Sequence, residues 1–123
     1  MNDILVVDDD ALTRSLIRDW LTDAGYKVRE AEDGEAALAL VRAEPARLVI
    51  TDMQMPRLNG AETLSILRRE RPSLPVIAMS ALFDSGCGVG PETVLMLGAR
   101  RVLTKPFAYQ ELLTAVREVL GAT

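Results

Sequence analysis

The sequence contains no histidine and only one cysteine, and these two shortages exclude several kinds of chemistry. Without histidine, the chain can build no Ser-His-Asp or Cys-His catalytic arrangement and no histidine-ligated zinc or iron site. With Cys87 as its single thiol, it can form no internal disulfide and no thiolate cluster. Any chemistry therefore depends on carboxylates, hydroxyls, lysine, arginine, backbone groups or a hard metal ion.

Long apolar runs and an excess of positive charge are also missing. No run approaches the ~18 apolar residues that span a bilayer, and the acidic start of the chain is not typical of a signal peptide. We therefore expect no membrane partner and a cytoplasmic location. The net charge of -4 argues against direct binding to nucleic acid, which requires a cationic face.

The composition is otherwise that of an ordinary globular protein, with 49% hydrophobic and 26% charged residues. A length of 123 residues fits one domain, which we expect to cover residues 1–123. Surface scaling predicts a folded surface of roughly 6,500 Å² against about 19,000 Å² for the unfolded chain. About two thirds of the surface is thus expected to be buried, enough for a core without a disulfide or a structural metal.

Short apolar runs alternate with amphipathic segments along the whole chain. Apolar residues at helical spacing, such as Leu12, Leu16 and Ile17, predict a first helix whose apolar face packs on the core, with Asp10 as its N-cap and Gly25 as its stop. Strands are predicted at 4–7, 26–31, 48–51, 76–79 and 102–103, with helices between them and after the last. This alternation predicts an α/β fold, a doubly wound five-stranded parallel sheet with helices on both faces.

Four of the five predicted strands are followed by polar or charged side chains. In chain order these are Asp8, Asp9 and Asp10, then Asp52, then Ser80, then Lys105. The carboxyl ends of parallel strands share one edge of the sheet, which is where α/β sheets bind ligands. Three ionised carboxylates at this edge carry a charge of -3, which a divalent ion and one lysine would balance. Oxygen ligands of this kind suit Mg²⁺ and do not suit zinc.

Each of these residues also has an ordinary structural interpretation. An acidic triplet at 8–10 is typical of helix capping, and Asp52 could begin an Asx-turn. Ser80 is typical of a strand end, and Lys105 of a solvated surface. The convergence of all of them on one edge favours a functional site.

Five segments of the chain resemble the receiver domain of two-component response regulators, the CheY-like superfamily. They are ILVVDDD at 4–10, TDMQMPRLNG at 51–60, VIAMSA at 76–81, GA at 98–99 and LTKPF at 103–107. The resemblance implies a flavodoxin-like fold with strand order 2-1-3-4-5. It also implies a phosphoacceptor signalling domain of a phosphorelay, which catalyses only its own phosphorylation and slow dephosphorylation.

The resemblance further implies roles for individual residues. Asp52 would receive a phosphoryl group from a phosphohistidine on a sensor histidine kinase or a histidine phosphotransfer protein. Ser80 would donate its hydroxyl to a phosphoryl oxygen, and Lys105 would pair first with Asp52 and then with the phosphoryl group. The peptide bond between Lys105 and Pro106 is expected to be cis, a geometry that is common only before proline.

The cofactor that the resemblance implies is Mg²⁺. Asp9 and Asp52 would bind it through their carboxylates, Gln54 through its backbone carbonyl, and Asp8 directly or through a water molecule. No other cofactor is expected.

Two places depart from the family pattern. Val102 stands three residues before Lys105, where the family has an aromatic switch residue, and the Gly-rich loop 83–90 is longer than expected. We therefore expect signal output through ordering of this loop and of the helix that follows it. Four consecutive apolar residues at 94–97 indicate either deep burial or a partner surface. The expected partners on that side are an output protein, an attached output domain, or a second copy bound on phosphorylation through the fourth helix, fifth strand and fifth helix.

Two other functional classes compete with this interpretation. A Mg²⁺-dependent phosphotransferase or phosphatase would need a second acid or base and a lid, and Asp10 is the only nearby acid left over. A phosphorylation-independent interaction module is disfavoured because all five site positions keep competent side chains.

Overall fold

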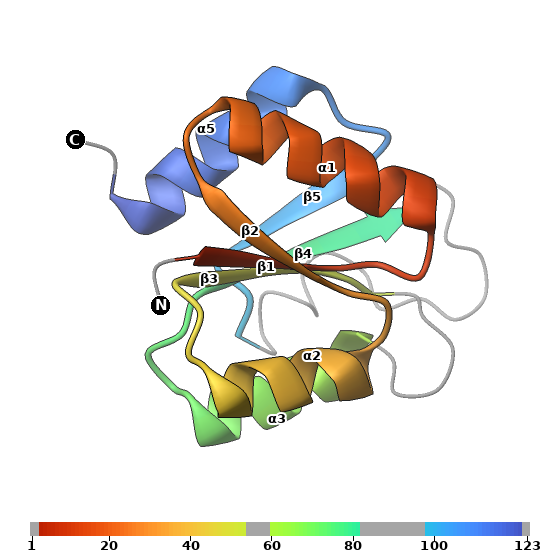
Figure 1. The fold of residues 1–123 in the computed structure, drawn as a ribbon. Helices are drawn as coiled ribbons and strands as arrows, with labels where there is room; N and C mark the ends of the chain where they lie inside the picture. Colours follow the sequence, from red (N-terminus) through yellow and green to blue (C-terminus); the bar gives the residue numbers. More distant parts are fainter. Residues whose placement is uncertain (1–2, 54–59, 82–97, 122–123) are drawn as a thin grey trace.

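The computed structural model describes residues 3–53, 60–81 and 98–121 (Figure 1). Its strands are β1 (Asp3–Val7), β2 (Lys27–Ala31), β3 (Leu48–Asp52), β4 (Val76–Ala81) and β5 (Arg101–Lys105). Its helices are α1 (Ala11–Asp23), α2 (Gly34–Ala43), α3 (Gly60–Glu70) and α5 (Tyr109–Leu120). The predicted alternation is confirmed for these elements. The loop 83–90 and, apart from Gly98, the predicted helix near 91–98 lie outside the described residues.

The five strands form one parallel sheet with the order β2-β1-β3-β4-β5. The order confirms the doubly wound arrangement expected from the sequence. The chain begins near the middle of the sheet, at β1, adds β2 on one side and then places β3, β4 and β5 on the other. The strand order therefore reverses between β1 and β3, and a sheet of this kind binds its ligand outside the carboxyl ends of the strands at that point.

Successive residues of each strand point to opposite faces, and each face carries its own core. Helices α1 and α5 cover one face and α2 and α3 cover the other (Figure 1). Ile4, Val6 and Ile50 belong to the core under α1 and α5. Leu5 and Val49 belong to the core under α2 and α3. Burial on both faces explains why β1, β3 and β4 contain continuous apolar runs, whereas the edge strands β2 and β5 are less buried and include charged residues.

Polar caps set where the first two helices begin. The Asp10 carboxylate accepts a hydrogen bond from the Leu12 amide at 3.3 Å and another from the Thr13 hydroxyl at 2.6 Å. The Asp33 carboxylate accepts from the Ala36 amide at 2.8 Å and caps α2 in the same way. Asp10 thus has the capping role predicted from the sequence, and the chain that follows β1 turns directly into α1.

The apolar face predicted for α1 is partly wrong. Ile17 is buried in the core, but the side chains of Leu12 and Leu16 are 82% and 47% exposed. Both lie in the first half of the helix, next to the carboxyl edge of the sheet. At about 100° per residue, both lie about 100° or more around the helix from the buried Ile17 and Leu21, so they fall outside the face that packs on the sheet.

The accessible surface of the structure is 6607 Å², which agrees with the value expected from the chain length. Within the three described ranges, we find no helix with the length and apolar character needed to cross a membrane.

Candidate functional site

Asp8 is fully buried directly after β1, and each of its carboxylate oxygens accepts a hydrogen bond. The Asp10 amide donates to Oδ1 at 2.9 Å, and the Lys105 ammonium donates to Oδ2 at 2.8 Å. A buried carboxylate is stable only when it is paired and hydrogen-bonded in this way. Asp8 is therefore held in one orientation at the edge of the sheet.

Lys105 ends β5 and precedes a cis peptide bond to Pro106, as the sequence predicted. Its ammonium lies between two carboxylates, 2.8 Å from Asp8 Oδ2 and 3.4 Å from Asp52 Oδ2. The predicted partner was Asp52, and the structure adds Asp8 as the nearer one. Burial alone would lower the pKa of Lys105, but the hydrogen bond to Asp8 and the negative charge of Asp52 outweigh it and raise that pKa. The lysine is therefore a permanent cation at neutral pH.

Asp52 is the last residue of β3 and is 6% exposed. Its carbonyl accepts a hydrogen bond from the buried Thr51 hydroxyl at 3.1 Å, and the amide of Met53 donates to the Met79 carbonyl of β4 at 2.9 Å. Both bonds fix the peptide unit that follows Asp52, and the pairing of Asp52 with Met79 of β4 fixes the strand that carries it. The carboxylate is thereby placed beside β1, at the reversal point of the strand order.

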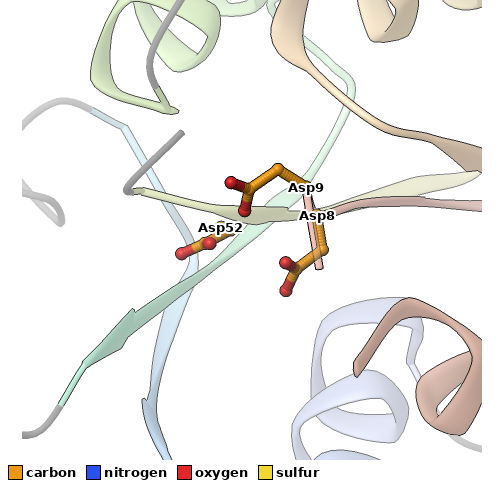
Figure 2. Close-up of side chains that lie close together, drawn as sticks. All are labelled: Asp8, Asp9 and Asp52. Carbon is orange, nitrogen blue, oxygen red and sulfur yellow. The ribbon is translucent and has the colours of Figure 1, made fainter. Parts of the chain in front are cut away.

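Asp8, Asp9 and Asp52 converge at this edge from the end of β1 and the end of β3 (Figure 2). Each offers one carboxylate oxygen, and these oxygens all lie within 4.8 Å of one another. An octahedral Mg²⁺ ion with bonds of about 2.1 Å needs ligands separated by about 3.0 Å when adjacent and about 4.2 Å when opposite. Asp9 is exposed, which leaves water access to the remaining positions. The three acids therefore fit Mg²⁺ after small side-chain rotations.

Ser80 lies on β4, between the strands that carry Asp52 and Lys105. It is buried, it pairs in register with Thr104 of β5, and it follows Met79, the register partner of Asp52. The strand register thus brings Ser80 to the same edge as the acids and the lysine. Gln54 lies outside the described residues, so its role as a carbonyl ligand stays a prediction.

Val102 takes the position where an aromatic residue was expected from the resemblance. It pairs with Ala78 of β4 and packs, partly buried, against the core under α2 and α3. The predicted output through the loop 83–90 and the apolar residues 94–97 falls outside the described residues.

Sequence reasoning missed the polar residues around Asp8. The Arg14 guanidinium of α1 donates to the Asp8 carbonyl at 2.7 Å and to Glu30 of β2 at 3.1 Å. Arg18 donates to the same Glu30 at 3.0 Å. The spacing of two arginines four residues apart on one helix face was a usable signal, but their acceptors become clear only in the fold.

A parallel sheet of this strand order, with an acidic cluster, a hydroxyl and a lysine at its carboxyl edge, defines the class of α/β domains whose functional site lies at the strand reversal point. Residues 4–117 match the family model described as response regulator receiver domain. The chain belongs to this family, and it is a receiver domain of two-component signalling.

Several relatives share this assignment. The chain is 39% identical over 120 residues to the response regulator MprA of Mycolicibacterium vanbaalenii, covering 98% of this chain and 51% of MprA. It is 34% identical to a probable chemotaxis protein CheY of Rhizobium etli, covering 97% of this chain and 92% of that protein. The chain thus spans about half the length of MprA and nearly all of the CheY relative.

Solved structures of similar chains support the same family assignment. The receiver domain of NtrX from Brucella abortus superimposes with a TM-score of 0.89 at 31% identity, covering 98% of this chain and all of that one. The chemotaxis protein CheY4 of Vibrio cholerae gives a TM-score of 0.85 at 30% identity, covering 98% and 99% of the two chains.

Proposed function

We propose that Asp52 accepts a phosphoryl group from a phosphohistidine of a partner protein and that this modification is the signal. The observation that carries the proposal is the placement of the Lys105 ammonium between Asp8 and Asp52, with three acidic oxygens within 4.8 Å of one another. This arrangement offers a carboxylate nucleophile, a fixed positive charge and a cation site in one space.

The transfer follows from the chemistry of these groups. An oxygen of the Asp52 carboxylate forms the new P–O bond while the P–N bond to the donor imidazole breaks, and the imidazole nitrogen keeps the electron pair. No general base is required, because the nucleophile is a carboxylate and the donor supplies an activated phosphorus. Charge develops on the equatorial phosphoryl oxygens, so the site acts by positioning and charge stabilisation.

Lys105 and Ser80 supply protein contacts to those oxygens. The raised pKa of Lys105 keeps its ammonium charged, and its position 3.4 Å from Asp52 places it beside the acceptor oxygen. The Ser80 hydroxyl provides a donor from the neighbouring strand. Asp8, Asp9, Asp52 and the carbonyl of Gln54 would hold Mg²⁺, which when bound neutralises phosphoryl charge.

The donor is proposed to be a sensor histidine kinase or a histidine phosphotransfer protein. Leu12 and Leu16 of α1 are exposed beside the acidic edge. Next to them lies a mostly apolar pocket of about 190 Å³, which Leu16, Trp20, Lys105 and Phe107 help to line. Lys105 belongs both to the pocket and to the site, so a protein docked on this surface of α1 can present its phosphohistidine to Asp52.

The downstream side of the signal is also a proposal. The chain spans about half the length of MprA. We propose that the phosphorylated domain acts on an attached output domain or on a separate output protein. We also infer a cytoplasmic location, because the phosphoryl group of such a donor derives from ATP.

The test is incubation with acetyl phosphate and Mg²⁺ followed by intact mass measurement. We expect one phosphoryl adduct, lost in Asp52→Ala and kept in Asp19→Ala, which removes an exposed acid of α1 far from the cluster. Turnover of other phosphoesters without an adduct would support a phosphatase or phosphotransferase instead. No adduct and no turnover would support a phosphorylation-independent interaction module.

A further inference from the structure

The backbone of Asp8 is held by a side chain that the chemistry above does not use. Arg14 donates through Nη1 to the Asp8 carbonyl at 2.7 Å and through Nε to Glu30 at 3.1 Å. The side chains of Arg14 and Glu30 are 18% and 28% exposed, so both bonds are partly shielded from water. A single planar guanidinium thus ties the end of β1 to the edge strand β2, which is a contact that lysine cannot reproduce.

Every polar group of Asp8 has a partner, and the partners come from several parts of the fold. Its amide donates to the Ala31 carbonyl at 3.1 Å, and its carboxylate accepts from Asp10 and Lys105. Arg14 completes the set by binding the carbonyl. That carbonyl belongs to the peptide unit that leads into Asp9, so its orientation sets the direction of two of the three acidic side chains.

We propose that Arg14, held in place by Glu30, is a positioning residue for the cation site. It fixes the peptide unit between Asp8 and Asp9 so that both carboxylates converge with Asp52. The inference rests on the proposed function, because it treats these acids as the Mg²⁺ ligands. Mg²⁺ demands near-ideal octahedral geometry, and residues that orient its ligands typically affect affinity about 10–100-fold.

Charge and positioning predict opposite effects for the removal of Arg14. If the guanidinium acted only through its positive charge, its loss would reduce repulsion of a cation and tighten Mg²⁺ binding. If it acts by holding the peptide unit, its loss weakens binding. Arg18 provides a matched control, because it carries the same charge, binds the same Glu30 at 3.0 Å and, among its described contacts, reaches Glu30 and Asp19 instead of Asp8.

The experiment measures Mg²⁺ affinity by calorimetry, and Mn²⁺ affinity by electron paramagnetic resonance, for the full chain and its variants. We expect Arg14→Ala to weaken binding about tenfold or more and Arg18→Ala to leave it unchanged. Glu30→Gln keeps Arg14 but loosens its hold, so it should weaken binding by a smaller factor. It also serves as the second variant should Arg14→Ala fail to fold, and unchanged affinity in Glu30→Gln would then overturn the proposal.

A second readout does not depend on any metal. The Asp10 amide binds Asp8 Oδ1 at 2.9 Å, so its hydrogen exchange in metal-free protein reports the order of this turn. We expect faster exchange in Arg14→Ala than in wild type, with Arg18→Ala unchanged. Equal affinities and equal exchange in Arg14→Ala and Arg18→Ala, or tighter binding in Arg14→Ala, would overturn the inference. A wild-type chain that binds neither ion would refute the proposed cation site, and Asp10 exchange would still decide the role of Arg14.

Discussion

Charged side chains are arranged differently at the two edges of the sheet: they form matched pairs at the amino edge and a cluster of acids at the carboxyl edge. At the amino edge, Asp3 pairs with Arg29, and Glu70 at the end of α3 pairs with Arg42 at the end of α2. At the carboxyl edge, Asp8 and Asp52 contact the same Lys105 ammonium, and Asp9 lies within 4.8 Å of both acids. Matched pairs stabilise the first edge. The second edge carries more negative charge than its described ion pairs neutralise, which supports the proposed cation site.

This difference indicates that the carboxyl edge is less stable than the amino edge because it carries the functional residues. Like charges in contact destabilise a protein, and such clusters persist at functional sites. The amino edge has no comparable cluster among the described residues. Removal of an acidic charge should therefore lower stability at the amino edge, where Asp3 is paired, and raise it at the carboxyl edge, where Asp9 lies among like charges.

The largest effect is expected from Lys105→Met. Removal of the ammonium leaves the buried carboxylates of Asp8 and Asp52 without their shared cation, which should cost about 3–5 kcal/mol at neutral pH. Urea unfolding measured by circular dichroism would give this value. An unchanged free energy of unfolding would show that Lys105 is not needed to balance this edge.

The same variant has a defined pH dependence. The pKa of Lys105 is raised in the folded state, so its contribution to stability is present below its ordinary value of about 10.5 and is lost as the pH rises through the folded value. On the alkaline side, the difference in stability between wild type and Lys105→Met should therefore begin to shrink above about pH 10.5. A difference that stays constant to higher pH would contradict the assigned ion pairs.

A somewhat smaller loss is expected when the amino edge is broken. Asp3→Asn removes the carboxylate that pairs with Arg29, and breaking such a pair should cost about 3 kcal/mol. Arg29 keeps its bonds to the carbonyls of Leu40 and Glu44, which places the cost at the low end. The matched substitution at the other edge, Asp9→Asn, should raise stability by about 0.5 kcal/mol, because it removes one like charge. If Asp3→Asn and Asp9→Asn changed the free energy of unfolding in the same direction, the proposed difference between the two edges would be wrong.

Added Mg²⁺ should increase the difference between variants at the carboxyl edge and variants at the amino edge. A ligand present at 100 times its dissociation constant stabilises the folded state by about 2.7 kcal/mol, so Mg²⁺ should raise the melting temperature of the wild type. Asp9→Asn should lose most of this gain, whereas Asp3→Asn should keep it. Ca²⁺-free and Mg²⁺-free protein in a chelator provides the baseline for each variant. An equal gain in all three proteins would mean that the ion binds elsewhere.

Much of the site could be predicted because the polar residues directly follow buried strands. Asp8, Asp52, Ser80 and Lys105 each come at or next to the end of an apolar run, and a parallel sheet brings all such ends to one edge. The nearer partner of Lys105 could not be predicted in this way. The choice between Asp8 and Asp52 depends on side-chain geometry, which strand patterns do not contain.

Other features depend on how α1 sits against the sheet. Helical spacing placed Leu12 and Leu16 on the core face, but periodicity alone does not show which side of a broad apolar stripe packs on the sheet. The bonds from Arg14 to Asp8 and Glu30 likewise require that α1 lies over β1 and β2 at one particular rotation. Local sequence specifies the elements, whereas these contacts arise from packing between elements.

The smallest effect is expected for Glu70→Gln, which breaks the exposed pair with Arg42. Arg42 Nε and Nη2 bind the two Glu70 oxygens at 2.9 and 2.6 Å, and these hydrogen bonds lower the pKa of Glu70. The contribution of the pair is therefore present above the ordinary pKa of Glu70 and is lost as the pH falls through the lower, folded value. Because exposed pairs are screened by salt, the difference between Glu70→Gln and wild type should also vanish in high salt. Thermal melts at low and high salt measure this. A difference that survives both high salt and acid would contradict the assignment of this pair as a charge interaction.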